Sequence, residues 1–262
     1  MIQSFDYTLH PTGRRTQITE LDGRTSDYTY NDLYWLTSET ISDVVNGNYT
    51  ASYHYDKVGN RVEAVEDGVT TQYSFDANDR LLQQGGVSYV YDDNGNTLSE
   101  DDQGALTLYG WNSQNQLIEH MAGGVTSNYR YNPDGVRQGQ SDDTSTTDYL
   151  VDSNRDYAQV LVESVDGSTA VAYHFGDDLI SQSRGGGEHF FHVDGLGSTR
   201  VLTDEVGAVT DAYAYAAFGE VLNQDGATEN RYLYTGEQYD EGLGQYYLRA
   251  RYYDQGLSLI HI

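Results

Sequence analysis

The sequence predicts an all-β protein assembled from repeated β-hairpins. Three observations lead to this prediction: a short aromatic phrase recurs along the chain, tyrosine is unusually abundant, and no long segment shows a helical apolar period. The 262 residues include 25 Tyr against 6 Phe, and only 2 Pro. Rings with one polar edge suit strands that bury one face and keep water close by.

The recurring phrase consists of an aromatic residue, any residue, a second aromatic, Asp or Asn, and a turn containing Gly or Asn. It is clearest at residues 53–62, 73–81, 89–98 and 129–136, with weaker copies beginning at Phe5, Tyr28, Leu108, Tyr173, Tyr213 and Tyr232. The second aromatics follow one another at a period of about 20 residues with some slack. A strict solenoid would hold its period more tightly, so we expect hairpins joined by loops of varying length.

Each repeat has a direct physical interpretation as one hairpin. Aromatics at positions i and i+2 share one face of a strand. We expect this for Tyr53, Tyr55, Tyr73, Phe75, Tyr89, Tyr91, Tyr129 and Tyr131. The turn that follows needs residues that tolerate positive φ or bond their own backbone. Those residues are Asp56, Gly59, Asn60, Asp92, Gly95, Asn96, Asp134 and Gly135. A lone hairpin is marginal in water, so stacked neighbours must form a continuous antiparallel sheet.

The charge balance excludes several classes of function. The chain carries 41 acidic and 14 basic side chains, for a net charge of -27, which argues against nucleic acid and anionic membranes as partners. With 0 Cys, the chain has no disulfide scaffold and no thiolate metal site. No apolar run is long enough for a transmembrane helix, and no signal peptide is visible.

The Tyr-Asp-x-x-Gly-Asn-Arg phrases resemble the YD-repeat, or RHS, family of bacterial polymorphic toxins, insecticidal toxin complexes and teneurins. The stretch from His192 to Asp254 is similar to the RHS repeat-associated core, which closes the array. The core phrases supply Asp194, Gly195, Gly197, Arg200, Phe218, Gly219, Gly236, Arg249, Arg251, Tyr252, Tyr253 and Asp254. The resemblance implies a sheet that spirals into a hollow shell around a variable C-terminal toxin domain.

The resemblance also predicts a division of the chain. We expect YD repeats over 1–172, the repeat-associated core over 173–254, and a tail outside the family pattern over 255–262. Family members usually continue past the residue corresponding to Asp254 into a self-cleavage motif and the toxin, and neither is present here. The sequence is therefore interpreted as the C-terminal portion of a shell, with a tail left by truncation or assembly.

No catalytic, cofactor-binding or metal-ligating residue is predicted. The many carboxylates invite an acid-pair hydrolase, but nearly every Asp stands at a turn position, where it caps its own backbone. The Asp92 loop fails as a calcium loop because Thr97 and Gln103 occupy the positions that need Gly and Glu. His189 and His192 fall on opposite faces of a strand, which argues against a shared metal.

The most direct functional hypothesis is a non-catalytic shell segment that encapsulates and helps to deliver a toxic domain absent from this chain. Its partners would be its own N-terminal shell and C-terminal toxin, and the full-length protein would be secreted or on the cell surface. The alternative is a repeat module that binds glycans or a cell-surface protein, and a third reading is an acid-pair hydrolase. Unpaired edge strands predict association of the isolated piece.

Overall fold

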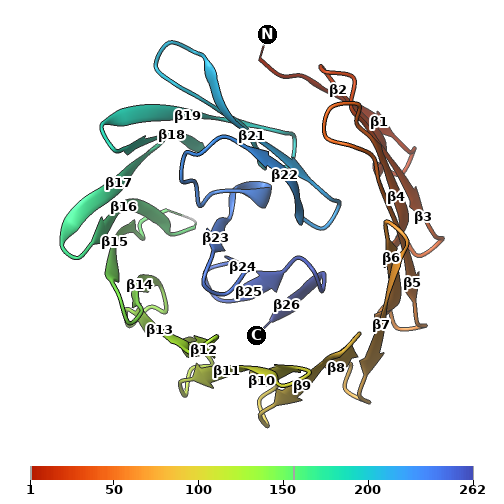
Figure 1. Cartoon of the computed structure of the whole chain (residues 1–262), viewed down its shortest axis with the longest axis horizontal. Coiled ribbons are helices and arrows are strands. Elements are labelled where there is room, and N and C mark those ends of the chain that lie inside the picture. Colours follow the sequence, from red (N-terminus) through yellow and green to blue (C-terminus); the bar gives the residue numbers. More distant parts are fainter. Residues whose placement is uncertain (1, 156, 262) are drawn as a thin grey trace. The chain divides into compact units, whose positions relative to one another are not determined.

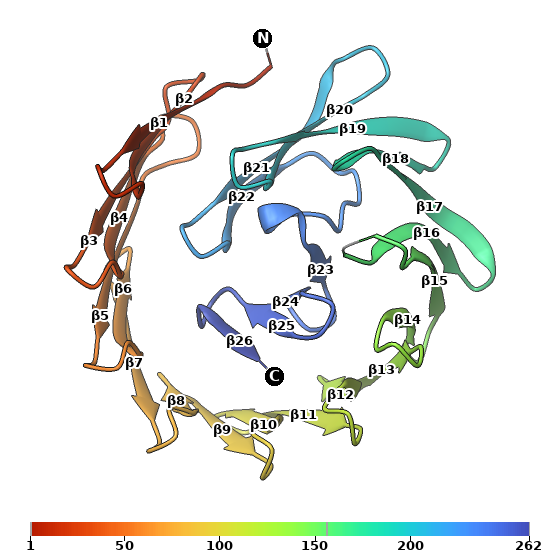
Figure 2. The same cartoon turned by 180° about the vertical axis from the view of Figure 1, so that it is seen from behind.

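The computed structural model describes residues 2–155 and 157–261, and its architecture is all-β (Figures 1 and 2). Strands β1 to β22 pair in sequence order, each antiparallel to the next, in a 22-stranded sheet, and β23 to β26 form a second sheet. Within the described residues the only helical element is one 3-10 turn, η1 (Tyr234–Gly236). The predicted fold class of tandem antiparallel hairpins is confirmed.

The chain divides into two compact units, one ending at Tyr89 and the other beginning at Val90. The first unit holds β1 (Phe5–Leu9), β2 (Arg15–Glu20), β3 (Thr25–Tyr30), β4 (Leu36–Ser42), β5 (Tyr49–Tyr55), β6 (Arg61–Glu66), β7 (Val69–Phe75) and β8 (Leu81–Gln84), and the division falls inside β9 (Val87–Tyr91). The boundary between residues 172 and 173 is predicted from a change in the repeat phrases and stays a prediction.

The second unit contains the rest of the long ladder and the small sheet. Its ladder strands are β10 (Thr97–Asp102), β11 (Ala105–Trp111), β12 (Leu117–Ala122), β13 (Val125–Tyr131), β14 (Arg137–Ser141), β15 (Thr146–Asp152), β16 (Gln159–Val165), β17 (Ser168–Phe175), β18 (Leu179–Arg184), β19 (Gly187–Val193), β20 (Thr199–Thr203), β21 (Val209–Tyr215) and β22 (Val221–Asp225). The small sheet holds β23 (Gln238–Asp240), β24 (Gln245–Tyr247), β25 (Tyr252–Asp254) and β26 (Leu259–His261).

The Asp-x-x-Gly-Asn turns are closed by the side chain of their first residue. In the turn that begins at Asp92, Oδ1 accepts hydrogen bonds from the backbone N–H groups of Asn94 (2.9 Å) and Asn96 (2.8 Å). Oδ2 accepts from the Asn96 side-chain amide at 2.8 Å. Gly95 has φ of 92°, so the turn uses the left-handed conformation that glycine adopts without strain.

The same arrangement recurs throughout both units. In each copy the first residue's Oδ1 accepts from the backbone N–H groups two and four positions later, and the copies begin at Asn31, Asp56, Asp76, Asn112, Asn132, Asp194 and Asp204. Where glycine is missing from the left-handed position, Tyr34, Asp79 and Asn115 take it, with φ of 70°, 61° and 57°. These carboxylates and amides are therefore engaged by their own turns.

The other ends of the hairpins use a second kind of turn. Five two-residue connections have positive φ at both positions, as type I′ turns require, and they are Asp67-Gly68, Gln103-Gly104, Gly123-Gly124, Asp166-Gly167 and Gly185-Gly186. The backbone twist of this turn matches the twist of paired strands. Long bulged turns and type I′ turns alternate from β9 to β14, whereas the long turns that begin at Asp194 and Asp204 follow each other directly.

The repeat aromatics lie on one face of the sheet. The first ring of each phrase is buried, as for Tyr53, Tyr73, Tyr89 and Tyr129, and the second rings Tyr55, Phe75, Tyr91 and Tyr131 are half-buried. The residue between the two aromatics is exposed at His54 and His174. Strand alternation therefore turns the rings inward and leaves the histidines on the other face.

In the second unit, the ladder curves around β23–β26, which lie on its concave side (Figures 1 and 2). Three buried clusters join the two layers. One combines Leu202, Tyr213 and Tyr215 with Leu233 and Tyr246; another combines Leu117 and Tyr129 with Tyr247 and Tyr252; the third combines Val171 and Tyr173 with Tyr232. The C-terminal residues thus supply the second layer that a single sheet lacks.

The Asp92 turn offers a matched test of side-chain capping. Replacing Asp92 by Ala removes the acceptor for three donors, so we expect a loss of about 1 kcal/mol in the free energy of unfolding. The control is Asp93→Ala, an equal loss of charge at an exposed neighbour. Thermal melts of both variants check the prediction, and equal melting temperatures would contradict it.

The turn carboxylates also predict acid sensitivity. Partial burial would raise the pKa of Asp92, but hydrogen bonds from Asn96 and Asn94 outweigh it and hold the pKa below its usual value. Asp56 and Asp76 also have lowered pKa values. Groups of this kind stabilise the fold above their unfolded pKa, about 4. We expect stability to decline as the pH falls through their folded pKa values, as measured by urea unfolding at successive pH values; a flat profile below pH 4 would refute it.

Candidate functional site

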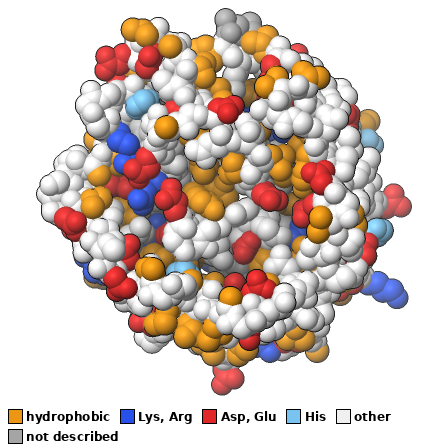
Figure 3. Space-filling view, in the orientation of Figure 1, with side chains coloured by type: hydrophobic (Ala, Val, Ile, Leu, Met, Phe, Trp, Pro, Cys, Tyr) orange, Lys and Arg blue, Asp and Glu red, His pale blue; other side chains and the backbone are white. Residues whose placement is uncertain are grey.

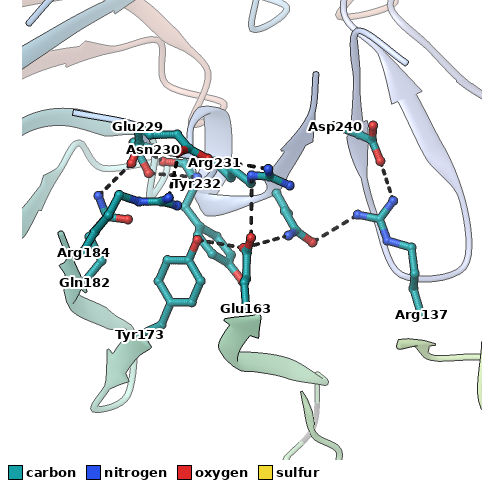
Figure 4. A network of polar contacts seen from close by, with 11 residues as sticks. Arg137, Glu163, Tyr173, Gln182, Arg184, Glu229, Asn230, Arg231, Tyr232 and Asp240 are labelled. Atoms are coloured by element: carbon teal, nitrogen blue, oxygen red, sulfur yellow. Dashed lines mark hydrogen bonds and ion pairs between the residues drawn. The ribbon is translucent and has the colours of Figure 1, made fainter. Parts of the chain in front are cut away.

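The described residues contain no group of three His, Asp or Glu side chains placed to hold a metal ion, and no helix that could span a membrane. The chemically most unusual feature is a buried polar network in the second unit (Figure 4). It joins the concave face of the ladder to residues 229–258, here called the C-terminal segment. Ionised groups are rarely buried unless they are paired, so the network is the candidate functional site.

Arg137, at the start of β14, forms the first centre of the network. Its Nη1 lies 2.5 Å from Oδ2 of Asp240 on β23, and both side chains are only 2% exposed. Its Nη2 donates to Oε1 of Gln238 at 3.3 Å. Its backbone N–H donates to the Tyr247 hydroxyl at 3.2 Å. One ladder residue therefore holds two strands of the small sheet.

Aromatic rings surround this guanidinium. Its carbon lies 4.1 Å from the centre of the Tyr247 ring and 5.5 Å and 5.6 Å from those of Tyr129 and Tyr149. Burial alone would lower the pKa of Arg137, but Tyr252 and Asp240 outweigh burial and raise it. The guanidinium therefore stays charged, and its desolvation is offset by ring faces and by a carboxylate.

Glu163, on β16, is the second centre. Its side chain is 2% exposed, and its Oε1 accepts from the Tyr173 hydroxyl at 2.8 Å and from Nε2 of Gln238 at 3.4 Å. Nε of Arg231 lies 3.7 Å from its Oε2. Gln238 links the two centres, because its amide oxygen accepts from Arg137 while its amide nitrogen donates to Glu163.

Two further ladder strands hold the beginning of the C-terminal segment. On β18, Arg184 pairs with Glu229 at 2.7 Å, and Gln182 donates to the Glu229 carbonyl at 3.0 Å. On β20, Thr199 donates its backbone N–H to the Leu233 carbonyl (2.9 Å) and its hydroxyl to the Tyr232 carbonyl (2.6 Å). Strands β14, β16, β18 and β20 thus each contribute at least one attachment.

The structure places the predicted core residues around this segment, some in contacts that fix it. Arg249 pairs with Glu237 at 2.5 Å, and the Tyr252 hydroxyl lies 3.1 Å from that of Tyr131. The Tyr253 hydroxyl donates to the carbonyl of Phe218 at 2.7 Å. A Cβ on Gly219 would lie 2.4 Å from the Tyr234 ring, so only glycine fits there.

The remaining core residues lie in turns and at their edges. Asp194 caps the turn that contains Gly195 and Gly197, and its Oδ2 lies 3.6 Å from Nη1 of buried Arg200. Gly236 ends η1 with φ of 71°, and Arg251 is exposed. Asp254 accepts from the backbone N–H of Leu257, which is buried, and β26 pairs with β25. The predicted tail boundary after residue 254 stays a prediction.

The sequence analysis did not single out the network's centres. Arg137, Glu163, Gln238 and Asp240 were missed, because each contact joins positions about 75 to 103 residues apart. One signal was present at Arg137: an arginine follows the turn there, as Arg61 does after the Asp56 turn. Basic residues are scarce in this chain, so an arginine at a repeated position is informative.

The Arg137–Asp240 pair allows a sharp stability test. Arg137→Met leaves Asp240 buried and unpaired, so we expect a loss of about 3–5 kcal/mol. The control is Arg130→Met, which breaks a pair with Asp148 whose side chains are 53% and 55% exposed, with an expected loss below about 1 kcal/mol. Urea unfolding provides the measurement.

A second variant keeps this test decisive if Arg137→Met does not fold. Arg137→Met combined with Asp240→Leu removes both charges, so we expect it to recover much of the lost stability. A double variant as unstable as Arg137→Met, or a control that loses as much, would show that the pair does not hold the segment.

A match to a family model identifies the family. The family model described as Teneurin YD-shell matches residues 5–258. Over 132 residues, or 48% of this chain, identity is 34% to the tRNA3(Ser)-specific nuclease WapA of Bacillus spizizenii and 32% to the tRNA nuclease WapA of Bacillus subtilis strain 168. The chain spans 6% of the length of each.

Among solved structures, the TcdB2-TccC3-Cdc42 crystal structure aligns with 97% of this chain and 18% of its own, at 13% identity and a TM-score of 0.46. The Photorhabdus luminescens Tc holotoxin pore aligns with 98% of this chain and 18% of its own, at 14% identity and a TM-score of 0.44. The family match itself leaves out only four residues at each end of the sequence. The chain therefore belongs to the teneurin YD-shell family, the YD-repeat family that its turn phrases resemble.

Proposed function

We propose that this chain is a non-catalytic shell segment of a larger RHS-type toxin, and that the shell encloses and helps to deliver a C-terminal toxic domain. The observation that carries the proposal is the position of the C-terminal segment. Four ladder strands hold it on the concave side of the second unit through the buried network. A domain that followed this segment would leave the sheet from its concave side.

The relatives support a division of labour between shell and toxin. The WapA proteins are named as tRNA nucleases, and this chain matches only 6% of their length. We infer that the matched part supplies the shell and that a nuclease or other toxic activity lies elsewhere in such proteins. The parent of this chain would then be secreted or displayed at a cell surface, with a longer N-terminal shell as a further partner.

The carboxylates support a non-catalytic role. The turn aspartates Asp56, Asp76 and Asp92 accept hydrogen bonds from their own loops. Glu163 and Asp240 are buried and paired with arginines. An acid-pair hydrolase needs two carboxyl groups that face a substrate across a cleft. The arrangement of these five therefore favours turn capping and anchoring over hydrolysis.

The tyrosine rows favour packing over glycan binding. Stacking on a sugar requires exposed ring faces. Tyr53, Tyr73, Tyr129 and Tyr173 are each at least nine-tenths buried, and the half-buried second rings pack beside them. The first rings of the repeats therefore cannot form a platform for an external glycan without unfolding the sheet.

A protease-protection experiment tests the proposal. The complete gene would be recovered from source DNA, and its full-length product digested under native conditions with proteinase K. We expect any domain encoded after residue 258 to resist digestion within the intact protein and to be cleaved rapidly when produced alone. Equal cleavage in both settings would overturn the enclosing role.

Two variants of the full-length protein sharpen this experiment. Arg137→Met weakens the anchor of the C-terminal segment, so we expect the enclosed domain to be digested faster. Arg130→Met removes an exposed arginine on the neighbouring strand and should leave protection unchanged. If the two variants behave alike, the buried network does not contribute to enclosure.

A further inference from the structure

A cavity of about 330 Å³ lies between the ladder and the C-terminal segment, beside the buried network. Phe175, Phe191 and Leu179 form part of its ladder wall, and Tyr232 and Glu237 belong to its opposite wall. The volume is at the lower end of the range for sites that hold small molecules or side chains. The proposed role as a shell does not involve this cavity.

The walls are rich in aromatic rings. Phe175 and Phe191 are half-buried, and the Phe175 ring meets the Tyr232 ring edge-on, at 6.5 Å between centres and 84° between planes. Tyr157, which is 70% exposed, also borders the cavity. A ligand with an apolar body would gain contact with these rings, and their faces attract a positive charge.

The charges around the cavity are mainly negative. Asp177, Asp178 and Glu237 border it, with Arg249 as the one basic residue among its described lining. Arg249 is already engaged by Glu237 at 2.5 Å, by the Ala158 carbonyl at 3.4 Å and by the Tyr157 ring at 5.5 Å. Within the described part of the chain, no ion pair is formed by Asp177 or Asp178.

The side chains of Arg155 and Gln159 also lie near the cavity. Arg155 lies close by, but it donates to the Gly176 carbonyl at 2.8 Å and lies 3.5 Å from Asp152. Gln159 borders the cavity, and its Oε1 is buried with no hydrogen-bond donor in contact. Because that oxygen has almost no accessible surface, it is not offered to a ligand in the cavity, and the charge of the lining comes mainly from Asp177 and Asp178.

We propose that this cavity binds a basic side chain, lysine or arginine, of the polypeptide that the shell encloses; the inference rests on the proposed function. The apolar stem of such a side chain would pack against the rings while its charged end meets the aspartates. The charge of the whole chain, -27, favours a basic partner in the same direction. Acidic side chains are scattered over the face in Figure 3, and basic ones are few.

A pair of matched probes tests the inference on the chain itself. N-acetyl-lysine methylamide and its neutral counterpart N-acetyl-norleucine methylamide would be titrated while chemical shifts are followed by NMR. We expect the lysine probe to bind at least tenfold more tightly, and its affinity to fall as NaCl is raised. Equal affinity for the two probes, or no saturable binding of the lysine probe, would overturn the inference.

Variants locate the binding. Asp177→Asn with Asp178→Asn should weaken lysine binding at least fivefold. Asp93→Asn with Asp143→Asn makes the same change in net charge at exposed positions outside the cavity lining and should leave binding unchanged. If both double variants weaken binding equally, only general charge is involved and the site is refuted. Protease protection of the enclosed domain is measured in a separate experiment. If the domain is protected but the lysine probe does not bind, the inference about the cavity is overturned and the proposed shell function is not.

Discussion

A single curved sheet rich in tyrosine is stable only if a second layer buries its concave face, and the fold of the second unit depends on this constraint. The chain meets this need with its own C-terminal segment, whose Tyr246, Tyr247 and Tyr252 complete the buried clusters. Because these rings carry hydroxyl groups, the interface contains buried polar atoms that need hydrogen-bond partners. Arg137 donates to the hydroxyls of Tyr247 and Tyr252 while pairing with Asp240, and the Tyr246 hydroxyl donates to the Gly219 carbonyl. Orientation of the segment is thereby fixed by charge as well as by packing.

The first unit shows the same chemistry in simpler form. Arg61 follows its turn as Arg137 does, and its guanidinium lies 4.7 Å from the Tyr73 ring centre and 5.5 Å from that of Tyr53. It also donates to the Tyr73 hydroxyl at 3.0 Å. An arginine between neighbouring tyrosine rows is therefore a repeated element of the sheet. At Arg137 this element is extended by Asp240, which turns a packing contact into an anchor.

The hairpins could be predicted from sequence because their turns are decided within five residues. In the loop that begins at Asp92, the carboxylate accepts from Asn94 and Asn96, all within five residues, and alternation along the strand then places the rings. The anchor could not be predicted in this way. Arg137 and Asp240 are 103 positions apart, and only the curvature of the ladder brings them together. Rules that concern neighbouring residues do not describe that curvature. The sequence therefore predicts the repeating hairpin but not the contact between Arg137 and Asp240.

The chain has few basic residues, and this scarcity explains how its charges are distributed. Arg24, Arg61, Arg137 and Arg200 are buried, where they offset carboxylates or lie against rings and backbone carbonyls. Arginines used inside cannot neutralise the surface, where acidic side chains such as Asp67, Asp93 and Asp166 are exposed. Exposed like charges repel one another, at some cost to compactness. If the shell encloses a basic polypeptide, as proposed, that polypeptide would relieve the repulsion.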